Sequence, residues 1–180
     1  MPAVFALCIA ELVLVMVLSA RLGKMSIAGA RGLFFAYAIL NGVTFSAVFF
    51  AYDVQILLSV FALTALYFGA LAAYGWLTQR DLSGLGTILG FSVLFLLVFW
   101  VLSMFLPLGA FERIICFIGL AVFMGCTAYD TQRIKHLHAE YGEDYEMSKK
   151  ASIFAALQLY LDFINIFLYI LRLLGRRSSN

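Results

Sequence analysis

An apolar run near the carboxyl end, LQLYLDFINIFLYILRLL (residues 157–174), carries Asp162 near its middle and Asn165 about one turn later. On a helix that turns about 100° per residue, the polar side chains of this run fall within an arc of roughly 80°. They are Gln158, Asp162, Asn165, Tyr169 and Arg172. A polar stripe of this kind faces other helices or water rather than lipid. Because the rest of the helix is also apolar, we predict that neighbouring helices surround it.

The composition of the whole chain indicates an integral membrane protein. Of the 180 residues, 64% are hydrophobic and 12% are charged, against about 25% charged in an ordinary soluble domain. A spanning helix needs about 20 mostly apolar residues, and six segments qualify. We therefore predict an all-α protein with one transmembrane domain over residues 1–180, with spans near 3–20, 32–52, 54–77, 86–106, 113–135 and 151–173.

The basic residues predict an orientation, because Lys and Arg gather in cytoplasmic loops. The connections after the first, third and fifth spans hold Arg21, Lys24, Arg31, Arg80, Arg133, Lys135, Lys149 and Lys150, whereas the opposite side has Arg113 in its loops. We expect the first group to be cytoplasmic, with residues 136–150 as a surface loop. Arg172, Arg176 and Arg177 disagree with this orientation. Either the rule fails at this end or the last segment is re-entrant, and we favour a full crossing.

Three acidic residues lie at bilayer depth, where an ionisable side chain indicates a functional site by default. They are Glu11, Asp130 and Asp162. Asp130 is about 8 residues before His138, where the run MGCTAYDTQRIKHLH (124–138) brings its helix to the cytoplasmic surface, and Asp162 is about 11 residues after the start of its own span. At 1.5 Å per residue these depths are roughly 12 and 16 Å, so the two carboxyl groups can meet.

Two carboxylates in contact do not both ionise readily, so the pair would share one proton over a window of pH. Above that window the pair would repel or recruit a cation, which makes it a pH-controlled latch. Calcium takes six to eight oxygen ligands, more than these groups supply, so we expect weak binding during passage and no tightly bound cofactor. The alternative is a buried hydrogen bond that only holds the bundle together.

For each of the other polar residues, two interpretations are open, one functional and one structural. Glu11 faces a water-filled cavity or lies against Asn41 and Thr44, and a structural hydrogen bond is favoured. For Arg21, or for Lys24 in its place, the two alternatives are a pairing with Asp130 after the side chain turns inward, and a simple anchor at the membrane interface.

Gly86 and Gly90 form a GxxxG pattern that permits close helix packing.

Three stretches of the sequence together carry a family resemblance. AYDTQRIK (128–135) and LQLYLDFINIFLYILRLL (157–174), together with ARGLFFAYAILNGVTFSAVF (30–49), resemble the transmembrane Bax-inhibitor motif family, in its bacterial YccA/YbhL-like branch. The resemblance implies an inner-membrane bundle of seven helices with a central carboxy-terminal helix. It also implies a pH-sensitive calcium leak gated by the aspartates that match Asp130 and Asp162, with a latch arginine that best matches Arg21. From this resemblance we expect the chain to lack the first of the seven helices.

The resemblance leaves a second function open, since YccA-type relatives modulate a membrane-bound protease. The expected partners are the bilayer, calcium or protons, and in this second case a membrane protease; a net charge of +2 gives no basic surface for nucleic acid. Enzymatic activity is not expected. The sequence contains no HExxH, GxSxG or phosphate loop. Tyr129-Asp130 matches half of an intramembrane aspartyl protease signature, but YLDF lacks the glycine of the other half.

Overall fold

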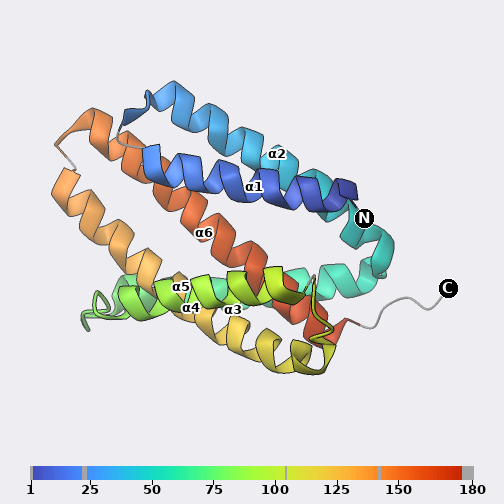
Figure 1. Ribbon diagram of the computed structural model, residues 1–180. Coiled ribbons are helices and arrows are strands. Elements are labelled where there is room, and N and C mark those ends of the chain that lie inside the picture. Colours follow the sequence, from blue (N-terminus) through green and yellow to red (C-terminus); the bar gives the residue numbers. More distant parts are fainter. Residues whose placement is uncertain (1, 22–23, 104, 142, 176–180) are drawn as a thin grey trace.

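The computed structural model describes residues 2–21, 24–103, 105–141 and 143–175. Within these ranges the chain forms six α-helices and the short 3₁₀ helix η2, without a strand, and consecutive α-helices run in opposite directions (Figure 1). The elements are α1 (Pro2–Arg21), α2 (Ile27–Ala51), α3 (Val54–Leu77), α4 (Leu85–Ser103), η2 (Gly109–Phe111), α5 (Glu112–Tyr141) and α6 (Tyr145–Leu174). The predicted all-α fold is confirmed.

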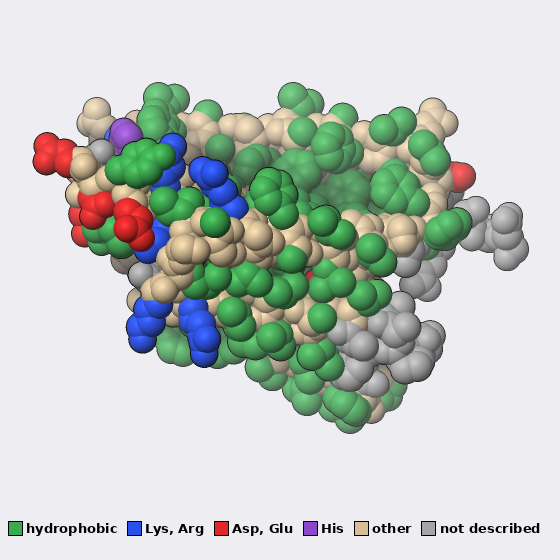
Figure 2. Space-filling view, turned by 90° about the horizontal axis from the view of Figure 1, so that it is seen from above, with side chains coloured by type: hydrophobic (Ala, Val, Ile, Leu, Met, Phe, Trp, Pro, Cys, Tyr) green, Lys and Arg blue, Asp and Glu red, His purple; other side chains and the backbone are tan. Residues whose placement is uncertain are grey.

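The outer surface of the bundle is apolar. Phe35, Phe50 and Leu66 expose 62%, 91% and 76% of their surface, and many other large hydrophobic side chains are similarly open. Figure 2 shows hydrophobic side chains over most of one face, with Lys and Arg gathered towards one end. Among the residues that the structure describes, five segments are long and apolar enough to cross a membrane: α2, α3, α4, the segment from Gly109 to Tyr141, and α6. An apolar surface of this extent is suited to lipid rather than water.

The carboxy-terminal helix α6 lies in the middle of the bundle, as predicted. Its first half packs against α1 and α2, where Leu157 is buried with Leu18 and Tyr37. Its second half packs mainly against α3 and α5, where Ile166 lies in one buried cluster with Leu57 and Phe123. Leu96 of α4 belongs to the same cluster. In Figure 1, α6 passes between the α1–α2 pair and the group formed by α3, α4 and α5.

The expectation of a surface loop over 136–150 is wrong. Helix α5 continues to Tyr141 and α6 begins at Tyr145, so helix occupies most of the segment. Hydropathy marks where the apolar span ends, but polar residues that favour helix can carry the helix on into water. Asp144 stabilises the start of α6 at Tyr145, because its Oδ1 accepts hydrogen bonds from the backbone N–H groups of Glu146 and Met147, each at 3.0 Å. Asp144 is therefore the N-cap of α6.

The last helix crosses the bundle from one end to the other. Helix α6 is continuous over its 30 residues, about 45 Å at 1.5 Å per residue, and it ends on the side opposite its start (Figure 1). A re-entrant segment would need a break in this helix, so the structure favours the full crossing. Arg176 and Arg177 lie outside the described residues.

Candidate functional site

The two membrane aspartates lie together at the interface of α5 and α6. Asp130 exposes 7% of its surface and Asp162 4%, and the two carboxyl groups are within hydrogen-bonding reach of each other. Neither side chain faces lipid. The helix pair that carries them makes the most extensive contact in the bundle, so the site lies at the centre of the fold.

The hydrogen bonding of this pair depends on a proton. Oδ2 of Asp162 is buried and has no hydrogen-bond donor among the residues that the structure describes. When both carboxyl groups are ionised, each can only accept, and no hydrogen bond can form between them. One added proton turns one group into a donor and satisfies the pair. An arrangement of this kind binds a proton more strongly when it is closed than when water surrounds both groups.

Helix α5 is positioned by direct contact with α3. A Cβ atom placed on Gly75 of α3 would lie 3.0 Å from both the Cα and the carbonyl carbon of Ala128, two residues before Asp130. The helices therefore touch backbone to backbone, which only glycine allows. One glycine of the GxxxG pattern is used in a similar way, because Gly86 packs against the ring of Tyr129. A Cβ atom placed on Gly90 would meet nothing within 4 Å outside its own helix in the described part of the chain.

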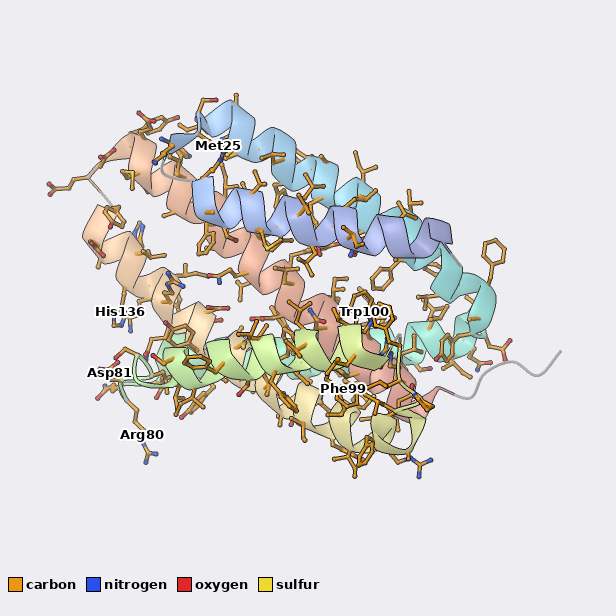
Figure 3. The ribbon with its side chains drawn as sticks, viewed as in Figure 1. Met25, Arg80, Asp81, Phe99, Trp100 and His136 are labelled. Atoms are coloured by element: carbon orange, nitrogen blue, oxygen red, sulfur yellow. The ribbon has the colours of Figure 1, made fainter. Side chains whose placement is uncertain are left out.

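Gln132 holds the connection between α3 and α4, a role that the sequence analysis missed. Its Oε1 accepts from the backbone N–H of Leu82 and its Nε2 donates to the carbonyl oxygen of Arg80, both at 2.8 Å. Beside this clamp, the pKa of Asp81 is lowered, mainly because its carboxylate accepts a hydrogen bond from the backbone N–H of Ser83. Figure 3 shows Arg80 and Asp81 in this connection, at the same end of the molecule as His136. A polar residue two positions after a buried aspartate gives no local sign of such a contact.

Glu11 belongs to a second polar cluster, apart from the aspartate pair. Thr44 donates to its Oε1 at 2.5 Å, and Asn41 donates to its Oε2 at 3.4 Å. The Tyr160 hydroxyl donates to Oδ1 of Asn41 at 3.1 Å, which links the cluster to α6. Asn41 itself exposes 5% of its surface. The predicted contact of Glu11 with Asn41 and Thr44 is present, and the cluster joins α1, α2 and α6.

The remaining members of the polar stripe on α6 do not gather around Asp162. The amide of Asn165 donates to the carbonyl of Leu161 in its own helix at 2.8 Å. Tyr169 packs on Gly119 of α5, with its ring centroid 6.0 Å from that of Phe123. Gln158 is half-buried and Arg172 is exposed at the far end of the helix. The stripe therefore splits between contacts with α5 and hydrogen bonds within α6.

The predicted latch cations are both at the surface. Arg21 and Lys24 are exposed near the end of α1, and neither forms an ion pair within the described residues. The cation whose charge acts on Asp130 is Arg133, one turn further along α5. Its guanidinium lies 5.5 Å from the centre of the Phe154 ring. The i, i+3 spacing of Asp130 and Arg133 in the sequence is the signal that would have found it.

Among the described residues, no three His, Cys, Asp or Glu side chains come together where they could hold a metal ion. The aspartate pair offers four carboxylate oxygens, fewer than the six to eight ligands that calcium takes. What the arrangement can do chemically is to hold and release a proton between two helices. Fold and site together define a helical membrane protein with a buried carboxyl pair at its centre.

Comparison with known proteins gives the family. Residues 1–179 match the family described as "Inhibitor of apoptosis-promoting Bax1". The chain is 41% identical over 172 residues to the inner membrane protein YbhL of Escherichia coli, covering 95% of this chain and 74% of that protein. It is 43% identical over 172 residues to an uncharacterised protein of Deinococcus radiodurans, covering 96% and 74%. It is 33% identical over 174 residues to the uncharacterised membrane protein SpyM3_0260 of Streptococcus pyogenes, covering 97% and 75%.

The chain therefore belongs to the Bax-inhibitor family of integral membrane proteins, and it spans about three quarters of the length of these relatives.

Proposed function

We propose that the protein is a pH-sensitive cation leak, with calcium as the expected ion and the carboxyl pair of Asp130 and Asp162 as its gate. The observation that carries the proposal is the burial of both carboxyl groups, in contact, between the two most extensively packed helices. Two acids placed together at bilayer depth are costly to the fold. A functional role accounts for their retention better than stability does.

The direction of the pH dependence follows from proton linkage. In the closed arrangement one proton joins the two carboxyl groups. As pH rises and this proton is lost, two like charges remain in an apolar interface, and Oδ2 of Asp162 is left without a donor. Separation of α5 and α6 then admits water or a cation to the charges. Since the closed state binds the proton more strongly, low pH favours it, and closure is lost as pH rises.

The size of the effect is bounded by the same linkage. If opening releases one proton, the ratio of open to closed protein changes by at most about tenfold per pH unit. Arg133 and the exposed Arg21 or Lys24 act as counter-charges in this scheme.

The test is calcium flux into dye-loaded liposomes as a function of pH. We expect flux through the unaltered protein to rise with pH, and Asp130→Asn and Asp162→Asn each to flatten the profile. Asparagine supplies a hydrogen-bond donor without a titrating proton, so the closed contact no longer depends on pH. Asp53→Asn is the matched control, because Asp53 is exposed in the α2–α3 connection and should leave the profile unchanged. If both dyad variants keep the original profile, the gate assignment is refuted.

A second candidate is a non-conducting protein that binds another membrane protein, such as a membrane protease. The feature that favours it is the helical hairpin formed by the end of α5 and the start of α6. Each of these helices has 30 residues, about ten more than a bilayer requires. This candidate predicts a co-purifying partner and no flux above that of empty liposomes.

A further inference from the structure

A groove of about 270 Å³ lies at the basic end of the bundle, separate from the aspartate pair. It is bounded by the end of α3, the last turns of α5 and the first turns of α6. Its apolar walls come from Trp76, Ile134, Leu137, Ala151 and Ala155. Pockets for whole small molecules usually measure about 300–1,000 Å³. The groove can therefore take only part of a larger amphipathic molecule.

The groove lies at the level where the membrane meets water. Trp76 exposes half of its surface, and Trp side chains concentrate at this interface. Arg133 and Lys135 flank Ile134 in the sequence, and both are exposed. His138, Ser148 and Ser152 supply polar groups to the lining of the groove. The groove thus combines apolar walls with polar groups, as an amphipathic ligand requires.

The rim of the groove carries positive charge. Nζ of Lys135 donates to the carbonyl oxygen of Trp76 at 3.4 Å, which holds the ammonium beside a lining residue. Figure 2 shows Lys and Arg gathered towards this end. Seven exposed cations lie in the connections and helix ends here: Arg21, Lys24, Arg31, Arg80, Arg133, Lys135 and Lys149.

Acidic residues lie near the groove but further from the membrane. Glu140, Glu143 and Asp144 occupy the tip of the α5–α6 hairpin, and Glu146 pairs with Lys150 at 2.6 Å. Glu140 is five residues beyond Lys135, about 7.5 Å along the helix axis. These carboxylates would repel an anion from the tip and so confine it to the level of Lys135.

We propose that this groove binds an anionic phospholipid. The first part of one acyl chain lies along the apolar walls, the phosphate faces the Lys135 ammonium, and the remainder of the chain stays in the bilayer. The charge of the rim decides the occupant, because a zwitterionic lipid of the same shape gains less from the cations. The site does not depend on the proposed ion leak, and each can be tested without the other.

The two tryptophans make the site measurable. Trp76 is in the groove, whereas Trp100 is near the end of α4, on the opposite side of the molecule from Arg80 (Figure 3). Trp100→Phe leaves Trp76 as the reporter, and Trp76→Phe leaves Trp100 as the matched control. In bilayers that contain dibrominated phosphatidylglycerol or dibrominated phosphatidylcholine, bromine quenches an adjacent tryptophan. We expect Trp76 to favour phosphatidylglycerol by about fivefold, as one cation near an anionic headgroup allows, and Trp100 to show no preference.

Substitutions at the rim distinguish lipid binding in this groove from general contact of the protein with lipid. Lys135→Gln keeps a hydrogen-bond donor but removes the charge, and should bring the ratio at Trp76 close to one. Lys135→Arg should keep the preference, and so should Arg80→Gln, which removes a cation from the same end outside the groove lining. Equal quenching of Trp76 by the two lipids, or a preference that survives Lys135→Gln, overturns the proposal.

Filling the groove provides a second test of the proposed lipid site if the Lys135→Gln variant does not fold. Ala151→Leu places a larger side chain on the lining of the groove. It should abolish the preference for phosphatidylglycerol at Trp76, while circular dichroism shows unchanged helix content. A preference that persists with the groove filled means that the lipid is attracted by the basic end as a whole, and the proposal is wrong.

Discussion

Gly75→Ala should destabilise the bundle at the level of Asp130. The added methyl carbon would lie 3.0 Å from two backbone carbons of Ala128, where ordinary contacts measure 3.4–4 Å, and closer still to its carbonyl oxygen. All of these atoms belong to the backbone of α5 and cannot rotate away. The two helices must therefore separate by several tenths of an ångström. Overpacking of this kind typically costs about 1–3 kcal/mol.

Gly69→Ala is the matched control for this prediction. Gly69 is in the same helix, and a Cβ atom there would meet nothing within 4 Å among the described residues. Both substitutions gain helix propensity, by about 1 kcal/mol at most, so the difference between them isolates the contact with α5. For a chain of this size, 1 kcal/mol corresponds to about 2–4 °C in Tm. Gly75→Ala should therefore unfold about 2–12 °C below Gly69→Ala in detergent.

Gly86→Ala should fall between these two variants. A Cβ atom on Gly86 would meet the end of the Tyr129 side chain, which can rotate where a backbone cannot. The assay is thermal unfolding followed by circular dichroism. Unfolding temperatures for Gly75→Ala and Gly69→Ala that agree within about 1 °C would show that α3 and α5 do not touch as described, because overpacking should separate them by more.

Two further predictions concern polar contacts between helices. Asn41→Leu removes the acceptor of Tyr160 and one donor to Glu11, and should destabilise the protein by about 1–3 kcal/mol, measured as a lower Tm; no change would show that the cluster does not join α2 to α6. Gln132→Leu leaves the backbone N–H of Leu82 without its acceptor, and should raise the hydrogen exchange of that amide by about 5–100-fold. Gln132→Glu retains an acceptor oxygen and should largely preserve the protection.

Much of the fold could be predicted from apolar run length alone. The span expected at 54–77 coincides with α3 (Val54–Leu77), and the polar stripe on 157–174 correctly placed α6 at the centre. The hairpin at 136–150 could not be predicted in this way. Its helical state depends on helix propensity and on the N-cap Asp144 rather than on hydropathy. The length of an apolar run contains no information about either.

The sequence identified the acids at the site but not what holds them. Depth along each span brought Asp130 and Asp162 to similar levels, and periodicity turned Asp162 inward. The choice of neighbours depends on packing between distant segments. Gly75 against Ala128, and Gln132 against the connection from Arg80 to Leu82, join residues about fifty positions apart. No local pattern reports such a contact.

The sequence by itself determined the apolar outer surface, the helical class and the position of each acid along its helix, because these follow from the transfer of side chains out of water and from a fixed rise per residue. Only the tertiary structure brought the two carboxyl groups within reach of each other and placed Glu11 in a different cluster, with Thr44 and Asn41. The physical reason is that these depend on how helices rotate and approach one another. Small steric details such as a missing Cβ on Gly75 set that approach.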